Sequence, residues 1–134
     1  MKPVDLLVVD DDVFLLEVLK DVFTDAGFNV HTAIDGQEAK KLLATERVDA
    51  VLTDGQYPDG GALGLLKYMK GDDRLSMLPV VVLTGGTDTR DPVFTGIPVL
   101  SKPAPLDKLI YVMKEAGTKR STPTPFAGLL ALTM

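Results

Sequence analysis

Cysteine is absent from this chain of 134 residues, and histidine occurs once, at His31. The lack of thiols excludes a disulfide framework and a thiolate metal site, and it suits a reducing compartment. His31 lies in a strand-like stretch, so we interpret it as structural. A histidine-based metal site and a Ser-His-Asp triad are not expected here.

Positive charge and long apolar runs are also scarce. The net charge is −5 and the pI is about 4.7, so a broad phosphate-binding face and direct contact with nucleic acid are not expected. The N-terminal residues lead into a short apolar stretch that ends in three aspartates. We therefore expect no signal peptide and no membrane insertion, and we place the protein in the cytoplasm.

What the chain does contain is the composition of one globular domain, with 46% hydrophobic and 25% charged residues. Short apolar runs alternate with segments of helical period, which predicts an α/β fold with a doubly wound parallel sheet. The five predicted strands are residues 6–9, 30–32, 50–52, 80–83 and 97–100. The first and fourth have no polar alternation, so we expect them in the centre of the sheet.

Apolar residues at helical spacing predict the connecting helices. The first helix ends at Gly27 and the second begins at Asp35-Gly36. The expected buried positions of the first, third and last helices are Leu15, Leu19, Val22 and Ala26, then Leu63, Leu66 and Met69, then Leu106, Leu109, Ile110 and Met113. The fourth crossover, at residues 85–92, is rich in turn residues and predicts only a shortened helix.

A change of composition divides the chain. Residues 1–117 are predicted to form the folded domain, and residues 118–134 read as a linker-like tail with an apolar end. Docking on the domain, pairing with another copy and connection to a further segment all remain open for this tail.

Polar side chains stand where four of the predicted strands end. Asp10 and Asp11 follow the first strand, Asp54 the third, Thr84 the fourth and Lys102 the fifth. Ligands of open parallel sheets gather at the carboxyl ends of the strands, so these groups should meet. Three converging carboxylates require raised pKa values or a cation, and an all-oxygen site with open positions suits Mg²⁺. An oxygen nucleophile, a cation and donors for phosphate oxygens are the needs of phosphoryl transfer.

The joint spacing of these motifs resembles the receiver domains of two-component response regulators over residues 4–116. The acidic pair Asp10-Asp11, Asp54 with Pro58 four residues later, Thr84-Gly85 and Lys102-Pro103 occur in family order. The resemblance implies a flavodoxin-like, CheY-like fold. It also implies that Asp54 is the phosphoacceptor and that Asp10, Asp11, Asp54 and the backbone carbonyl of Gln56 hold Mg²⁺, with Asp10 acting mainly through water. Thr84 and Lys102 would bind the phosphoryl group and serve as the switch.

The resemblance further implies phosphorelay signalling. The donor would be a histidine kinase, a phosphotransfer protein or a small phosphodonor, and a change of conformation would alter partner binding. The chain would not be an enzyme, beyond catalysing its own phosphorylation and dephosphorylation. Asp12 is predicted to cap the first helix. Val13 and Phe14 are candidates for partner contact, with core packing as the alternative for Phe14. The oligomeric state is not assigned.

Some residues depart from the family pattern. Val99 stands where many receivers have an aromatic residue, and the segment between Thr84 and Lys102 is about one helical turn short, so output through the usual face is not expected. Gly55 replaces a bulky apolar residue, and Tyr57 stands where methionine is frequent. Gln56 and Gly86 lie where family members vary in admitting water, so the phosphoryl lifetime is not assigned.

Two other functions remain open. A receiver-like interaction module that is not phosphorylated would also fit the short crossover and Val99. A phosphatase resembling the haloacid dehalogenase superfamily would use Asp10 and Asp12, but it needs a later acidic pair on a strand and gives Asp54 no role.

Overall fold

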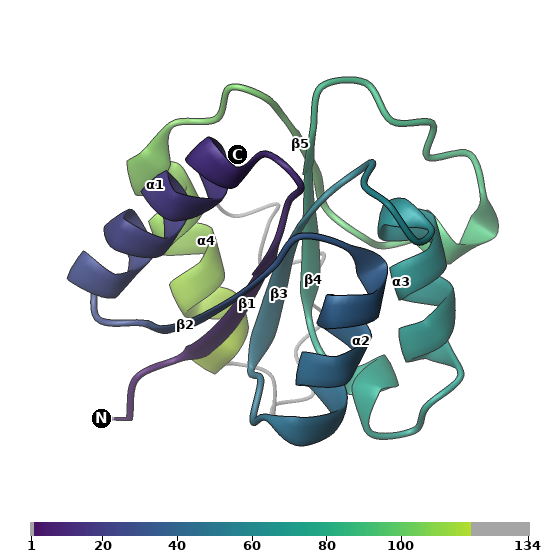
Figure 1. Cartoon of the computed structure of the whole chain (residues 1–134), viewed down its shortest axis with the longest axis horizontal. Helices are drawn as coiled ribbons and strands as arrows, with labels where there is room; N and C mark the ends of the chain where they lie inside the picture. Colours follow the sequence, from purple (N-terminus) through teal and green to yellow (C-terminus); the bar gives the residue numbers. More distant parts are fainter. Residues whose placement is uncertain (1, 119–134) are drawn as a thin grey trace.

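The computed structural model describes residues 2–118. Five parallel strands form one sheet in the order β2-β1-β3-β4-β5 (Figure 1). The strands are β1 (Asp5–Val9), β2 (Asn29–Ala33), β3 (Ala50–Asp54), β4 (Val80–Thr84) and β5 (Val99–Ser101). Each overlaps a predicted strand, and the order places β1, β3 and β4 inside the sheet, so the doubly wound fold is confirmed.

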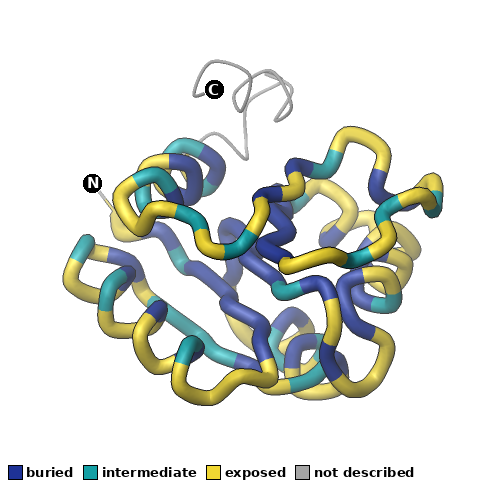
Figure 2. Tube along the Cα trace, turned by 90° about the horizontal axis from the view of Figure 1, so that it is seen from above, coloured by how far each residue is buried: buried dark blue, intermediate teal, exposed yellow. Residues whose placement is uncertain are grey.

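Helices cover both faces of the sheet. They are α1 (Val13–Asp25), α2 (Gly36–Thr45), α3 (Gly61–Lys70) and α4 (Leu106–Thr118), with short 3₁₀ turns η1 (Leu75–Met77) and η2 (Pro92–Phe94). Helices α1 and α4 lie on one face, and α2 and α3 lie on the other (Figure 1). The central strands are therefore enclosed, and Figure 2 shows this as buried backbone running between exposed helical turns.

Successive residues of each central strand enter different cores. In β1, Leu7 and Val9 pack with α2 and α3, whereas Leu6 and Val8 pack with α1 and α4. A strand alternates its side chains between the two faces, so a run that is apolar at every position fits only a strand covered on both sides. Removal of these side chains from water stabilises the two layers against the sheet.

The helix faces differ from the prediction by about one residue. The buried apolar positions of α1 are Leu16, Leu19 and Phe23, so the predicted stripe through Leu15 and Val22 was displaced, and both are only partly buried. In α3, Leu65 is buried and Leu63 is exposed. At the start of α4, Leu106 is 42% exposed. These helices each carry more apolar residues than one stripe needs, and packing against the sheet selects among them.

The helix ends follow the local sequence. Asp12 caps α1 by accepting a hydrogen bond from the Leu15 N–H at 3.2 Å, as predicted. Asp35 caps α2 in the same way, with the Glu38 N–H at 2.8 Å. Gly27 follows α1 with a φ of +97°, a conformation that glycine adopts without steric cost.

The fourth crossover contains only the 3₁₀ turn η2, which confirms the predicted shortening. Asp91 accepts a hydrogen bond from the Val93 N–H and pairs with Lys67 of α3 at 3.4 Å. Val93 and Phe94 are buried in the core beside α3. The short segment is thus held at both a polar and an apolar contact.

Helix α4 continues through Thr118, one residue past the predicted end of the domain. The remainder of the predicted tail, residues 119–134, lies outside the described residues. Within residues 2–118, no helix has the length and apolar character needed to cross a membrane.

Candidate functional site at the carboxyl edge of the sheet

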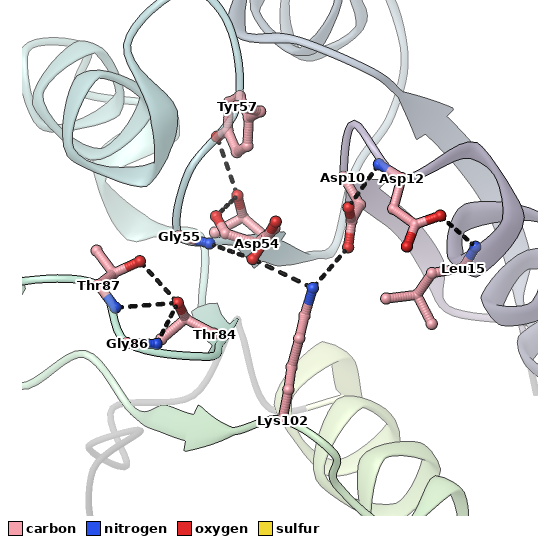
Figure 3. A network of polar contacts seen from close by, with 11 residues as sticks. Asp10, Asp12, Leu15, Asp54, Gly55, Tyr57, Thr84, Gly86, Thr87 and Lys102 are labelled. Carbon is pink, nitrogen blue, oxygen red and sulfur yellow. Dashed lines mark hydrogen bonds and ion pairs between the residues drawn. The ribbon is translucent and has the colours of Figure 1, made fainter.

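Four strands deliver polar side chains to one edge of the sheet. Asp54 and Thr84 are the last residues of β3 and β4, while Asp10 and Lys102 directly follow β1 and β5. The register pairs Asp54 with Leu83 and Thr84 with Ser101, which keeps these strand ends level. The predicted convergence of these residues is therefore present (Figure 3).

Asp10 is buried, with 2% of its surface exposed. Its Oδ1 accepts a hydrogen bond from the Asp12 N–H at 2.9 Å, and its Oδ2 accepts one from the Lys102 Nζ at 3.2 Å. Both carboxylate oxygens thus have a donor within the site.

Lys102 reaches between two carboxylates (Figure 3). Its Nζ also lies 3.3 Å from Oδ1 of Asp54, the oxygen that accepts the Gly55 N–H at 2.7 Å. Among the described residues no hydrogen bond or ion pair reaches the other oxygen, Oδ2 of Asp54. One carboxylate oxygen of Asp54 is held, and the other is open to an incoming group.

The site perturbs the protonation of its members. Burial raises the pKa of Asp10 above its ordinary value of 3.8, and the charge of Asp54 adds to this rise, while the Asp12 N–H and the Lys102 ammonium oppose it. Burial by itself would lower the pKa of Lys102, but the hydrogen bond and charge of Asp10, together with Asp54, outweigh burial and raise that pKa. The lysine therefore stays protonated as the only cation that contacts these carboxylates among the described residues.

The acidic cluster fits a magnesium ion. Asp10, Asp11 and Asp54 each offer a carboxylate oxygen, and these oxygens all lie within 4.8 Å of one another. Neighbouring oxygens around Mg²⁺, each at about 2.1 Å from the ion, are about 3 Å apart, so a bound ion would draw these three oxygens closer together. Asp11 is exposed and Asp54 is partly exposed, which leaves room for coordinated water.

Gln56 is exposed and belongs to the same depression as Asp54. The other residues that line this depression are Thr84, Gly85, Gly86, Thr87 and Lys102.

Asp12 caps α1, and its side chain points toward Leu15 (Figure 3). Val13 and Phe14 are 56% and 86% exposed, so the alternative of core packing for Phe14 was wrong.

Sequence reasoning missed Thr87 and assigned no contact to Tyr57, and both lie beside Asp54. Thr87 contacts Thr84 through their hydroxyl oxygens at 2.6 Å. Tyr57 is buried, and its phenol lies 2.9 Å from the Thr53 hydroxyl. Burial raises the pKa of Tyr57 to about 12, so the phenol remains neutral at physiological pH. The sequence features that could have pointed to these residues are a threonine three residues after Thr84 and an aromatic residue in the loop after Asp54.

The geometry defines a class: a doubly wound α/β protein with an acidic cluster and a lysine at the carboxyl ends of its strands. The family model described as "Response regulator receiver domain" matches residues 6–113. The chain belongs to the response regulator receiver family, and hence to the proteins of two-component systems. This membership removes the haloacid dehalogenase alternative, and the capping role of Asp12 agrees with its removal.

Relatives of known sequence support the same assignment. The response regulator MprA of Mycolicibacterium vanbaalenii is 36% identical over 133 residues, covering 94% of this chain and 55% of that protein. The transcriptional regulatory protein GltR of Pseudomonas aeruginosa is 30% identical over 88 residues, covering 66% of this chain and 36% of GltR. The chain thus spans about half or less of the length of these curated relatives.

Solved structures have the same fold. A putative response regulator from Chloroflexus aurantiacus superposes with a TM-score of 0.77 at 30% identity, covering 87% of this chain and 99% of that one. A CheY-like receiver domain protein from Methanospirillum hungatei gives a TM-score of 0.80 at 22% identity, covering 91% and 99%, which supports the fold alone. The predicted CheY-like architecture is confirmed.

Proposed function

We propose that this chain accepts a phosphoryl group on Asp54 and changes its binding surface in response. The observation that carries the proposal is the convergence of Asp10, Asp11 and Asp54 with Lys102 at one edge of the sheet. Family membership supports the chemistry, because receivers work in two-component signalling. The donor is a histidine kinase, a phosphotransfer protein or a small phosphodonor.

In the proposed reaction, the unengaged Oδ2 of Asp54 attacks the phosphorus of a phosphohistidine. The new P–O bond forms as the P–N bond breaks, and the electron pair leaves with the imidazole nitrogen. The Gly55 N–H holds the other oxygen of Asp54 and orients the carboxylate. The Lys102 ammonium then pairs with the phosphoryl oxygens, and the Thr84 hydroxyl donates a hydrogen bond to them.

Mg²⁺ would be held by Asp11, Asp54 and the backbone carbonyl of Gln56, with Asp10 acting mainly through water, and it would neutralise the charge on the phosphoryl oxygens. Because Lys102 contacts both Asp10 and Asp54, a bound cation would share these carboxylates with the lysine. The cytoplasm is the compartment we propose.

Incubation with Mg²⁺ and acetyl phosphate tests the proposal. The expected result is a mass gain of one phosphoryl group, and chemical-shift changes around β3 and β4 with beryllofluoride, in the wild type and not in Asp54→Asn. Asp59→Asn is the matched control because Asp59 is an exposed carboxylate in the loop after β3. Asparagine also tolerates its positive φ of 66°.

A second function has its own support. Thr84 is bonded within its own loop, and the fourth crossover is only a 3₁₀ turn, which suits a receiver-like interaction module that is never phosphorylated. A wild type with neither an Asp54 adduct nor a response to beryllofluoride would establish this module and reject the phosphoacceptor.

A further inference from the structure

The hydroxyl of Thr84 is fully engaged by the loop that follows β4. Its Oγ1 accepts N–H hydrogen bonds from Gly86 at 3.3 Å and from Thr87 at 3.2 Å, and it lies 2.6 Å from Oγ1 of Thr87. Figure 3 shows these contacts on the side of Thr84 away from Lys102.

The number of hydrogen-bonding groups fixes the direction of the short bond. A threonine hydroxyl has one proton and two acceptor sites. The Gly86 and Thr87 N–H groups occupy both acceptor sites of Thr84. Its one proton is therefore donated to Oγ1 of Thr87, and in this arrangement it is not available to a phosphoryl group on Asp54.

Gly55 provides the space that Thr87 occupies. A Cβ on Gly55 would overlap with the Thr87 hydroxyl and would lie 2.6 Å from Oγ1 of Thr84. Gly55 directly follows Asp54, and Thr87 lines the same depression as Asp54 and Lys102. A bulkier residue after Asp54 would expel Thr87 from this place, so the glycine and the threonine fit each other.

We propose that Thr87 is a positioning residue that engages the proton of the Thr84 hydroxyl, so that it opposes the switch until a phosphoryl group is present. We call the Thr84–Thr87 hydrogen bond the threonine latch. The inference rests on the proposed function, since the latch matters only if Asp54 accepts a phosphoryl group. Switching requires Thr84 to exchange its bond to Thr87 for one to the phosphoryl group.

The effect of the threonine latch on the switching equilibrium should be modest. A neutral hydrogen bond contributes modestly to an equilibrium in water, so removing it should favour the switched state by about 2- to 10-fold. Thr87→Val keeps the shape of the side chain and deletes its hydroxyl. The variant should therefore bind beryllofluoride about 2- to 10-fold more tightly than the wild type in Mg²⁺.

A second readout does not depend on phosphorylation. Three-bond NMR couplings to the methyl carbon of Thr84 report its χ1 rotamer in the Mg²⁺-bound protein without a phosphoryl analogue. We expect one rotamer in the wild type and averaging between rotamers in Thr87→Val. A role in packing alone would leave this rotamer unchanged.

Two control variants make the test specific. Thr87→Ser retains the hydroxyl and should restore both the single rotamer and the wild-type affinity. Thr89→Val makes the same substitution in the same loop, at a partly buried residue for which no hydrogen bond is present in the described structure, and should behave as the wild type.

The outcomes separate this inference from the proposed function. If the wild type responds to beryllofluoride through Asp54 but Thr87→Val shows unchanged affinity and an unchanged Thr84 rotamer, the latch is rejected and the phosphoacceptor stands. Weaker binding by Thr87→Val would make Thr87 a phosphoryl ligand and would also reject the latch. If no Asp54-dependent response exists, the proposed function fails and the latch fails with it.

Discussion

Asp10 illustrates, at the scale of one residue, how the site holds a charge in an unfavourable place. Its carboxylate is buried beside Asp54, and one hydrogen bond from Asp12 and one from Lys102 do not cancel the loss of solvent, so its pKa is raised. A group that is harder to ionise in the folded state than in the unfolded state reduces stability once it is ionised. Ionisation of Asp10 therefore lowers the stability of the fold.

Asp10→Asn should raise the free energy of unfolding of the metal-free protein at pH 7 by about 1 kcal/mol, since the amide carries no charge into the site. The folded pKa of Asp10 is raised. The contribution of Asp10 to the free energy of unfolding is therefore fully present below pH 3.8 and is lost as the pH rises through the folded pKa. The advantage of the variant should therefore shrink as the pH falls toward 3.8. Urea unfolding of both proteins between pH 7 and pH 4 measures this difference in the free energy of unfolding.

Asp11→Asn is the control for this prediction. It removes a charge from the same cluster, but Asp11 is exposed and solvent screens it, so the gain should be smaller. Equal gains in both variants would show that general charge repulsion, and not burial of Asp10, limits stability.

At the scale of one element, the start of α1 depends on a local contact. The Asp12 side chain caps the helix through the Leu15 N–H, and its neighbours Asp10 and Asp11 belong to the acidic cluster. Of the three consecutive acids, Asp12 therefore caps the helix and Asp10 and Asp11 belong to the acidic cluster. The turn between β1 and α1 determines which acid takes which position.

Asp12→Ala should lower the free energy of unfolding by about 1 kcal/mol, the usual cost of losing a helix cap. Asp12→Asn removes the same charge and retains a capping oxygen, so its free energy of unfolding should remain near that of the wild type. The difference between the two variants in urea unfolding isolates the cap. If the asparagine variant loses as much as the alanine variant, the charge and not the hydrogen bond stabilises α1.

The elements also differ in how well the sequence predicts them. The strands, the cap at Asp12 and the start of the second helix at Asp35-Gly36 were predicted because apolar runs and helix-starting side chains act over a few neighbouring residues. The buried faces were less predictable. Leu63 and Leu65 are both apolar, and only the docking of α3 on the sheet makes one exposed and the other buried.

At the scale of the whole molecule, helices α1 and α4 expose several large apolar side chains. Phe14 and Val18 of α1 are 86% and 49% exposed, and Leu106 at the start of α4 is 42% exposed. Helices α1 and α4 cover the same face of the sheet (Figure 1). Within the described residues, the surface around β5 and the fourth crossover has no such helices, because this crossover lacks a full helix, and Val99 of β5 is 39% exposed.

Phe14→Ala should slow phosphotransfer from a phosphorylated histidine kinase by about 10-fold, because an exposed aromatic side chain near the site is a suitable anchor for a docked partner. Stability should change by less than about 0.5 kcal/mol. Rates with acetyl phosphate should be unchanged, since a small donor needs no docking surface. Stopped-flow or quench measurements with both donors make the comparison.

Met77→Ala is the matched control for Phe14→Ala. Met77 is 73% exposed and apolar, but it lies in η1, just before β4, and so at the opposite edge of the sheet. Equal slowing by both variants, or slowing with acetyl phosphate as well, would count against a docking role for Phe14.

The sequence by itself determined the alternation of strands and helices, the short fourth crossover and the set Asp10, Asp11, Asp54, Thr84 and Lys102, because periodicity and strand-end position are local properties. The tertiary structure alone decided that Lys102 bridges Asp10 and Asp54 and that Thr87 enters the space beside Gly55. These contacts join residues from separate strands and loops. Their geometry depends on the register of the sheet and on the path of each loop, which no local pattern encodes.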